Sequence, residues 1–446
     1  MFLLAACYHP SPTVGLPCSP SGECPEGQVC DLTTAPPTCV VMTGDAGADP
    51  DAPVDAALDC VGPSDCTQDT EPVCDPFAHV CRGCVADTEC SGACAEYDGR
   101  CVPSGMVIYI AATGVDGGGC TASAPCRSFA FGLSQVTANR RMIRVGDGSY
   151  AASAGSVTLS ISNTAGRIVV SGTDRSSAGA ELTAMSNGVT NPAVVQTGNN
   201  TDVVIEGITI RSGQNDGVRS DGALLLSRVD IRDNNGRGVS SNPTNQAALR
   251  IWDSRIATND NRGVVAQKGP FELLRTVVIR NSEGGVEIQE CASTIVGSMI
   301  VRNGGTGANF GGLMLRNLAQ LPQTIAFVTI ANNQASGANI AGLDVDSIVA
   351  ISSSIVTDNT NANLGAPQLS AECSATYSLF SGAAPIGTGN VGAAPGFVNP
   401  LLDDFHLRST SAARDAADPA ATVRIDLDGD PRPLGNGFDI GADEVP

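Results

Sequence analysis

The sequence predicts an all-β chain, a right-handed parallel β-helix preceded by a small disulfide-rich region. Three observations carry this prediction: a short apolar strand that recurs every 21–30 residues, polar turn residues after most recurrences, and cysteines gathered in the first third of the chain. Aromatic residues make up only 4% of the chain, and glycines number 51. Few large side chains and many glycines suit a stack of thin repeats better than one thick globular core.

The repeat is clearest after residue 199. Alignment on an apolar-x-Ile strand gives successive spacings of 21, 25, 23, 21, 30 and 25 residues for Ile210, Ile231, Ile256, Ile279, Ile300, Ile330 and Ile355. Polar turn residues follow closely, namely Asn234, Asn259, Asn281, Asn303, Asn332, and Asp358 with Asn359. We expect the isoleucines to point inward as one column. We expect the asparagines to adopt the left-handed turn conformation and to bond the amide of the next coil.

Two further strands complete each coil. One begins with glycine, as in Gly217-Val218, Gly238-Val239, Gly263-Val264, Gly285-Val286, Gly312-Leu313 and Gly342-Leu343, and the other includes Ala223–Leu226 and Phe271–Leu274. Three short strands in a coil of about 22–25 residues are typical of a parallel β-helix. The Leu-x-x-Leu-x-Leu framework of leucine-rich repeats is absent from the sequence.

The cysteines of the first third form three quartets with similar spacing. These are Cys18, Cys24, Cys30 and Cys39; Cys60, Cys66, Cys74 and Cys81; and Cys84, Cys90, Cys94 and Cys101. The single CxxC pair, Cys81 with Cys84, straddles two quartets, whereas zinc ribbons need paired CxxC knuckles. We therefore expect disulfides in an oxidising compartment, with Cys120 and Cys126 as a further pair and the connectivity within the quartets left open.

Cys291 and Cys373 lie outside these groups. About three coils separate them, or about 14 Å along the axis, whereas a disulfide requires Cα atoms about 4.4–6.8 Å apart. Both thiols are therefore expected to stay reduced.

The chain begins Met1-Phe2-Leu3-Leu4-Ala5-Ala6-Cys7, and Leu4–Cys7 resembles a bacterial lipobox. That resemblance implies that Cys7 is lipidated and that the protein is a lipoprotein of the outer membrane or cell surface, or is extracellular. The apolar stretch before Cys7 is shorter than that of a complete signal and has no basic residue, which indicates a start assigned too far downstream. A lipid anchor is the expected membrane attachment, because no segment has the roughly 18 apolar residues of a spanning helix.

Composition marks the domain boundaries. Residues 1–7 hold the lipobox, 8–42 a first cysteine-rich unit, 43–59 a linker rich in Ala, Asp and Pro, and 60–105 two further cysteine-rich units. The β-helix with its N-terminal cap is expected over 106–400, and its C-terminal cap over 401–446. Residues 1–105 contain 16 acidic and two basic residues, so they carry −14 of the net charge of −21. This acidity argues against nucleic acid as a partner.

The flanks of the repeat resemble those of secreted bacterial right-handed parallel β-helix repeat proteins. The matching segments are Tyr109–Phe129, Ile143–Tyr150, Phe405–Ser411, Asp426–Arg432 and Asp439–Glu444, the last with Asp443 where that family usually has Tyr. The resemblance implies a short helix over Phe129–Asn139 that plugs the N-terminal end. It covers about residues 106–446 and says little about chemistry.

Similar β-helices include two enzyme classes, polygalacturonases and polysaccharide lyases. A polygalacturonase needs Gly-His-Gly and Arg-Ile-Lys motifs, but the three histidines, His9, His79 and His406, stand in other contexts and Lys268 is the single lysine. A polysaccharide lyase needs a base, often Arg, and cations to stabilise the enolate of a uronate. Arginines are plentiful in the repeats, so a lyase that acts on an acidic polysaccharide stays an alternative.

A candidate glycan-binding surface consists of Arg211, Arg232 and Arg280, which each follow a column isoleucine and so are expected to face outward on one side. Arginine forks can bind carboxylates, although stacked cations also need acidic partners. Trp252, the single tryptophan, could stack on a sugar ring. The competing interpretation is that these arginines are solvated and paired with neighbouring acidic side chains.

Asp426, Asp428 and Asp430 stand at alternate positions, the spacing that calcium loops use, and form a candidate calcium site. The competing interpretation is an Asp/Gly turn. No cofactor is expected to be required, and calcium is the candidate ion. The sequence thus favours a non-catalytic, surface-anchored β-helix that binds a glycan or another cell-envelope component, with a lyase and a purely structural envelope protein as alternatives.

Overall fold

The computed structural model describes residues 28–31, 38–41, 60, 65–75, 80–151, 156–172, 179–183, 193–317, 319–361, 368–381 and 387–445. The chain divides into two units, residues 1–59 and 60–446. In the first unit, β1 (Gln28–Asp31) pairs with β2 (Thr38–Val41) in antiparallel register, with Cys30 opposite Cys39. Cys7, Cys18, Cys24, the side chains of Cys30 and Cys39, and residues 43–59 lie outside the described residues, so the predictions for them stay predictions.

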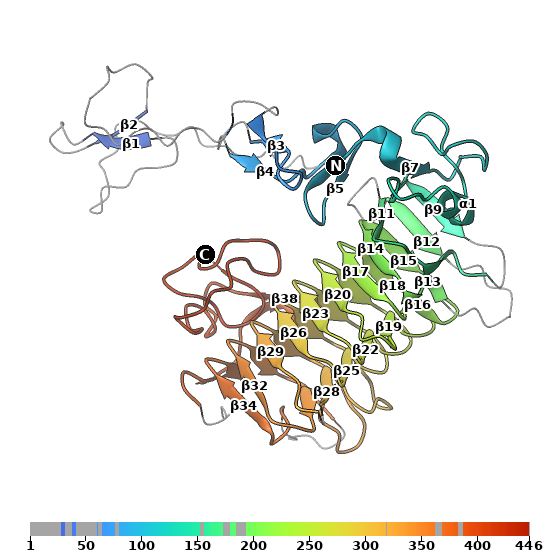
Figure 1. Cartoon of the computed structure of the whole chain (residues 1–446). Helices are drawn as coiled ribbons and strands as arrows, with labels where there is room; N and C mark the ends of the chain where they lie inside the picture. The colour runs from blue at the N-terminus through green and yellow to red at the C-terminus, as the bar shows by residue number, and fades with distance from the viewer. Residues whose placement is uncertain are drawn as a thin grey trace, which may run out of the picture. The chain divides into compact units, whose positions relative to one another are not determined.

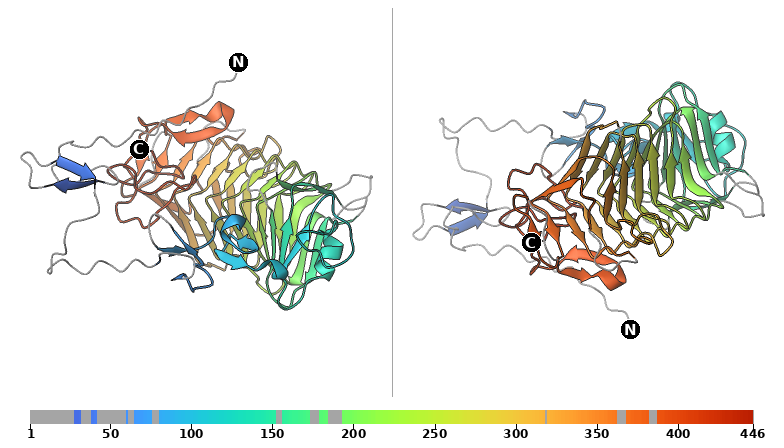
Figure 2. Two further views of the ribbon diagram at one scale, coloured as in Figure 1. Left: turned by 90° about the horizontal axis from the view of Figure 1, so that it is seen from above. Right: turned by 90° about the horizontal axis from the view of Figure 1, so that it is seen from below.

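The second unit confirms the all-β parallel β-helix. Its strands stack into three parallel sheets that run along one axis (Figures 1 and 2). Sheet I contains β10 (Leu159–Asn163), β13 (Ala193–Asn200), β16 (Asp216–Ser220), β19 (Val239–Ser241), β22 (Val264–Gln267), β25 (Val286–Gln289), β28 (Leu313–Arg316) and β31 (Leu343–Val345).

Sheet II contains β7 (Val107–Ile110), β8 (Met142–Val145), β11 (Ile168–Gly172), β14 (Asp202–Glu206), β17 (Ala223–Ser227), β20 (Leu249–Trp252), β23 (Phe271–Leu274), β26 (Ser293–Val296), β29 (Gln323–Ala326), β32 (Val349–Ser352) and β34 (Cys373–Thr376). Sheet III contains β9 (Gly148–Ala151), β12 (Ala180–Thr183), β15 (Ile208–Arg211), β18 (Asp230–Arg232), β21 (Arg255–Ala257), β24 (Val277–Ile279), β27 (Met299–Val301), β30 (Thr329–Ala331), β33 (Ile355–Thr357), β35 (Leu379–Phe380) and β36 (Val391–Gly392).

The predicted inward column lies in sheet III, but two of its members are wrong by one residue. The column contains Ile210, Ile231, Ile256, Val278, Ile300, Ile330 and Val356, so Ile279 and Ile355 face outward. At the two misplaced positions, neighbouring residues on opposite faces are both apolar and buried, namely Val278 with Ile279 and Ile355 with Val356. Alternation therefore gives no signal that could fix the register from the sequence.

The expected asparagine ladder is present and consists of Asn234, Asn259, Asn281, Asn303, Asn333 and Asn359, so the prediction of Asn332 is wrong by one residue. Each member except Asn359 donates from its amide to the carbonyl oxygen of the next, as Asn259 Nδ2 does to Asn281 Oδ1 at 2.8 Å. The left-handed conformation belongs to the residue before each ladder asparagine, as at Asp233 with a φ of 54°, so this prediction is wrong for the ladder members and right for Asn332, with a φ of 55°. The glycine that starts the next strand lies against this ladder, because a Cβ on Gly263 would come within 2.8 Å of Asn281 Nδ2.

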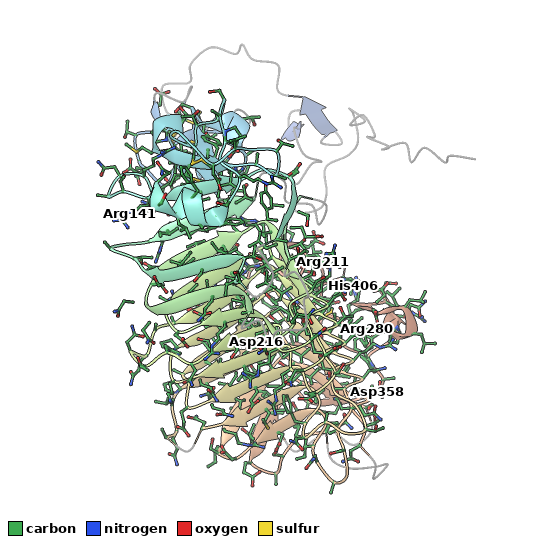
Figure 3. All side chains as sticks on the ribbon, turned by 90° about the vertical axis from the view of Figure 1, so that its right-hand side faces the viewer. Arg141, Arg211, Asp216, Arg280, Asp358 and His406 are labelled. Atoms are coloured by element: carbon green, nitrogen blue, oxygen red, sulfur yellow. A yellow bond between two sulfur atoms is a disulfide. The ribbon has the colours of Figure 1, made fainter. Side chains whose placement is uncertain are left out.

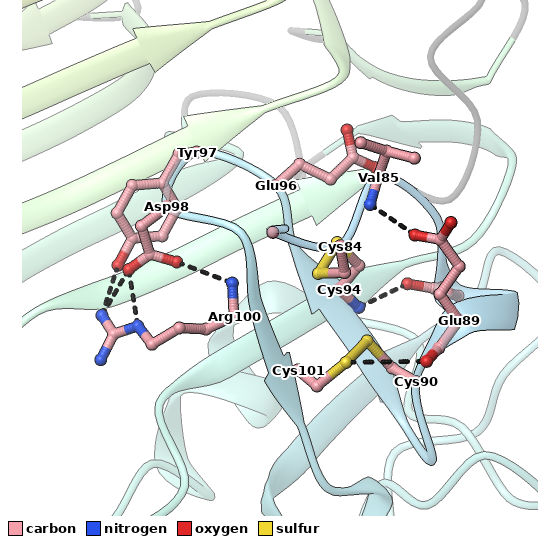
Figure 4. Close-up of a disulfide and its surroundings, with 12 residues drawn as sticks. Cys84, Val85, Glu89, Cys90, Cys94, Glu96, Tyr97, Asp98, Arg100 and Cys101 are labelled. Carbon is pink, nitrogen blue, oxygen red and sulfur yellow. Dashed lines mark hydrogen bonds and ion pairs between the residues drawn. A yellow bond between two sulfur atoms is a disulfide. The ribbon is translucent and has the colours of Figure 1, made fainter. Parts of the chain in front are cut away.

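The described cysteines form the predicted disulfides. Within the second and third quartets the first cysteine pairs with the third and the second with the fourth, giving Cys60–Cys74, Cys66–Cys81, Cys84–Cys94 and Cys90–Cys101. Cys120 pairs with Cys126, while Cys291 and Cys373 are free, as expected. These bonds hold β3 (Val73–Cys74), β4 (Cys81–Arg82), η2 (Asp87–Glu89), β5 (Ala93–Ala95) and β6 (Arg100–Val102), and Figure 4 shows the third quartet.

The third cysteine-rich unit packs on the outer face of sheet II. Ala93 and Ala95 join an apolar cluster with Val107, Met142 and residues of the next three strands. The buried guanidinium of Arg144 lies 2.7 Å from the carboxylate of Asp87. This unit therefore covers the first coils, and we call residues 84–102 the cysteine-rich cover.

The N-terminal end carries the short helix that the family resemblance implied. Helix α1 spans Phe129–Ser134 and ends five residues before the expected Asn139. The Ser128 hydroxyl accepts a hydrogen bond from the backbone N–H of Phe131 and caps the helix. A short turn, η3 (Ser104–Met106), precedes β7. In the part of the chain that the structure describes, no helix is long and apolar enough to cross a membrane.

The last residues cover the outer face of sheet III. Residues 397–445, which contain β37 (Phe397–Asn399), η4 (Pro400–Leu402) and β38 (Asp404–Leu407), bury Phe405, Phe438 and Ile440 against Ile279 and Ile355. A fully buried ion pair between Arg432 and Glu444, with a 3.1 Å contact, holds this segment together. We call residues 397–445 the C-terminal cover.

Candidate functional site

A groove of about 500 Å³ lies between the outer face of sheet III and the C-terminal cover. Its position follows from a change along the outer column of that sheet. In β18 and β21 this face carries the polar residues Asp230 and Arg255, whereas in β24 and β27 it carries Val277 and Met299. The cover packs on the apolar part, and the groove opens where the charged part begins.

The floor of the groove is apolar. It is formed by Val277, Met299 and Val301 from the strands and by Phe405 and Leu427 from the C-terminal cover. Phe405 is fully buried and stacks edge to face on Phe397, with ring centroids 5.2 Å apart. Met299 and Val301 are also buried, whereas Val277 and Leu427 are partly exposed and can pack against the C–H face of a sugar ring.

The rim of the groove carries paired charges. Arg275 makes a bidentate contact with Asp253 at 2.6 and 2.9 Å, and Arg255 lies 3.3 Å from Asp230. Arg228, Asp253 and Arg275 occupy equivalent turns of successive coils, each with a positive φ. The groove lining contains four side chains that can carry a positive charge, namely Arg228, Arg255, Arg275 and, when protonated, His406. It contains four acidic side chains, namely Asp230, Asp253, Asp403 and Asp428.

His406 lies on the wall of the groove, on β38 (Figure 3). Its Nδ1 is 2.7 Å from Asp404 Oδ1, and its Nε2 is 3.0 Å from Asp428 Oδ2. The hydrogen bond to Asp428 raises the pKa of His406 to about 9, and the same bond lowers the pKa of Asp428. Burial raises the pKa of the neighbouring Asp443 carboxyl to about 6.

The three arginines predicted to form a glycan-binding strip do not line the groove. Arg211 and Arg232 are neighbours in one outer column. Arg280 lies in a turn with a φ of 57°, because Val278 and not Ile279 is the inward residue of the preceding strand. Arg211 pairs with Glu181 at 2.7 Å, Arg232 with Asp230 and Asp233, and Arg280 with Asp403. Each predicted arginine therefore already has an acidic partner.

Trp252 lies on the outer face of sheet II, outside the groove lining. It packs against the apolar cluster beneath the cysteine-rich cover, and its indole N–H donates to Glu272 Oε2 at 3.3 Å. The structure therefore does not bring Trp252 together with the three arginines.

The three carboxylates of the candidate calcium loop do not converge. Asp426 is fully buried, and its oxygens accept the backbone N–H groups of Asp428, Asp430 and Glu444. Asp428 instead contacts His406, and the Asp430 side chain is exposed. Among the described residues, the group of carboxylates and imidazole that could hold a metal ion is His406, Asp428 and Asp443.

Sequence reasoning missed the groove arginines Arg228, Arg255 and Arg275. A signal was present, because Arg228, Asp253 and Arg275 each stand three residues before an inward residue of sheet III, at Ile231, Ile256 and Val278. His406 carried no signal, since its partner Asp428 lies 22 residues away in an irregular segment.

Comparison with known proteins identifies the fold and leaves the family open. No family model matches the chain, and no curated protein matches it. Among solved structures, the crystal structure of the pectate lyase Pel9A is similar, with a TM-score of 0.59 and 16% sequence identity over 76% of this chain and 96% of that chain.

Proposed function

We propose that this chain is a non-catalytic glycan-binding protein and that the groove between sheet III and the C-terminal cover is its binding site. The observation that carries the proposal is an apolar floor bordered by carboxylate–guanidinium pairs. Sugars present apolar C–H faces and many hydroxyl groups, and half-exposed Asp and Arg side chains can donate to and accept from such hydroxyls.

The charge of the groove favours a neutral glycan over a uronate polymer. The lining contains as many acidic as cationic side chains. A polyanion gains most from cations that lack acidic partners, whereas Arg275 and Arg255 each contact an aspartate. A neutral polyhydroxylated ligand does not repel the aspartates.

A polysaccharide lyase is the second candidate, and the fold likeness to a pectate lyase favours it. Arg255 is the residue for that role, because its side chain is 47% exposed, against 27% for Arg228 and 22% for Arg275. It would remove the proton next to a uronate carboxylate, and further cations would stabilise the enolate.

One panel of polysaccharides separates these candidates. The whole chain is run in affinity gels that contain neutral glucans, mannans or galactans, and in parallel gels with pectate or alginate. Retardation by a neutral polymer, without the absorbance of an unsaturated product from uronates, supports the binding function. Release of an unsaturated product that Arg255→Gln abolishes would support the lyase instead, and no retardation by any polymer would contradict glycan binding.

We also propose that Cys7 anchors the protein to the cell surface through lipid. Lipoproteins need more than one acyl chain for stable attachment, so loss of the modified cysteine should release the protein. The Cys7→Ser variant should move from the membrane fraction to the soluble fraction. Unchanged fractionation would contradict the anchor.

A further inference from the structure

We propose that His406, Asp428 and Asp443 form a binding site for one zinc ion beside the groove. One ligand atom from each of the three side chains lies within 4.8 Å of the other two. Imidazole nitrogen together with carboxylate oxygen is a ligand set that suits zinc, whereas calcium takes oxygen ligands only. This site shares Asp428 with the calcium loop predicted from the sequence, but its other ligands and its metal differ.

The histidine is oriented as metal-bound histidines are. Asp404 Oδ1 lies 2.7 Å from Nδ1 of His406, which directs Nε2 toward Asp428 at 3.0 Å. A carboxylate that accepts the other ring N–H fixes the tautomer and makes the ligating nitrogen more basic. Asp404 is therefore a positioning residue.

The two carboxylate ligands are held by the backbone around them. Asp443 is 6% exposed, and its Oδ2 accepts the backbone N–H of Leu407 at 2.5 Å. Asp428 lies in the loop that Asp426 closes by accepting the N–H groups of Asp428 and Asp430. The buried Asp426 thus shapes the loop and leaves Asp428 free to act as a ligand.

The charge of the cluster calls for a cation. Three carboxylates (Asp404, Asp428 and Asp443) surround one imidazole, so the group keeps a charge of about −2 even when the ring is protonated. A divalent ion neutralises that charge and replaces the proton on Nε2. Because His406 and Asp428 line the groove, the ion's remaining coordination position is accessible to water or to a ligand hydroxyl.

The site is tested on the whole oxidised chain, purified without a histidine tag and treated with chelator. Calorimetry with Zn²⁺ alone should show one site, and Co²⁺ should give the visible absorption bands of a four- or five-coordinate ion. His406→Gln and Asp428→Asn should each weaken Zn²⁺ binding at least about tenfold, and Asp404→Asn should weaken it roughly 10- to 100-fold.

Asp430→Asn is the matched control, because it removes an exposed carboxylate from the same loop and should leave the affinity within about twofold. No Zn²⁺ binding by the parent chain would overturn the proposal. So would equal weakening by Asp430→Asn and Asp428→Asn, or binding of Ca²⁺ without Zn²⁺. The measurement uses no glycan, so its failure leaves the proposed glycan-binding function standing.

Discussion

The asparagine ladder and the turn that carries Arg228, Asp253 and Arg275 both repeat once per coil. They differ in the surroundings of their side chains. In the ladder, Asn259 is fully buried and bonds the next coil through its amide. In the neighbouring turn, Arg228, Asp253 and Arg275 also repeat once per coil, but their side chains are 22–32% exposed and line the groove. Stacked polar groups that satisfy one another stabilise the coil, whereas stacked groups that stay at the surface can bind a ligand.

The largest effect is expected inside the ladder. Asn234→Ala removes the acceptor of the buried Gly213 N–H and the amide donor to Asn259 Oδ1, an oxygen that still accepts the backbone N–H of residue 234. We expect a loss of about 3 kcal/mol in the free energy of unfolding, measured by urea denaturation, because one unsatisfied buried group costs about 1–3 kcal/mol and the lost amide hydrogen bond about 0.5–1.5 kcal/mol.

Asn235→Ala is the control for this prediction. Asn235 is the next residue along the same turn and is exposed, so its replacement should change the free energy by less than about 0.5 kcal/mol. Equal losses for the two variants would show that the ladder contributes no more than a surface asparagine.

A smaller loss is expected where the cysteine-rich cover docks on sheet II. Arg144→Met leaves Asp87 without its 2.7 Å partner and should cost about 2 kcal/mol, less than a fully buried pair because Asp87 is 35% exposed. Hydrogen exchange in β5 should speed up, since this strand packs on the same face. The exposed Arg127→Met serves as control, and unchanged exchange in the Arg144 variant would contradict the docking contact.

The smallest stability effect concerns Glu206 at the end of β14, which accepts the backbone N–H of Tyr97 from the cysteine-rich cover and pairs with Arg228. Burial raises the pKa of the Glu206 carboxyl above its ordinary value of 4.5. A raised folded-state pKa means that the folded protein binds the proton more tightly, so this contribution to stability is present in acid and is lost as the pH rises through the folded-state pKa.

Glu206→Gln removes that pH dependence. The variant should match the parent protein in acid and melt at a slightly higher temperature at pH 7, measured by calorimetry. The exposed Glu283→Gln should show no such crossover. A lower melting temperature for Glu206→Gln at pH 7 would mean that its ion pair outweighs the cost of burial.

The coil could be predicted from the sequence because its signals are local. Inward residues, ladder asparagines and glycines recur at one-coil spacing, and the cysteine quartets are compact. The outward positions of Ile279 and Ile355 could not be predicted, because burial on both faces removes the alternation. The groove could not be predicted either, since one wall, with Phe405 and His406, folds back from beyond the last coil onto strands more than 100 residues earlier.

The central claim, that the groove and not the predicted arginine strip binds glycan, is tested most directly by two matched variants. Arg255 and Arg211 lie on outer columns of sheet III, each pairs with one carboxylate residue, and their side chains are 47% and 36% exposed. The affinity of Arg255→Gln and Arg211→Gln for the neutral polymer that retards the parent protein is compared in affinity gels. Loss of one charge-assisted hydrogen bond, about 1.5–3 kcal/mol, predicts at least about tenfold weaker binding for Arg255→Gln and a change within about twofold for Arg211→Gln. Weaker binding by Arg211→Gln with Arg255→Gln unchanged would contradict the account.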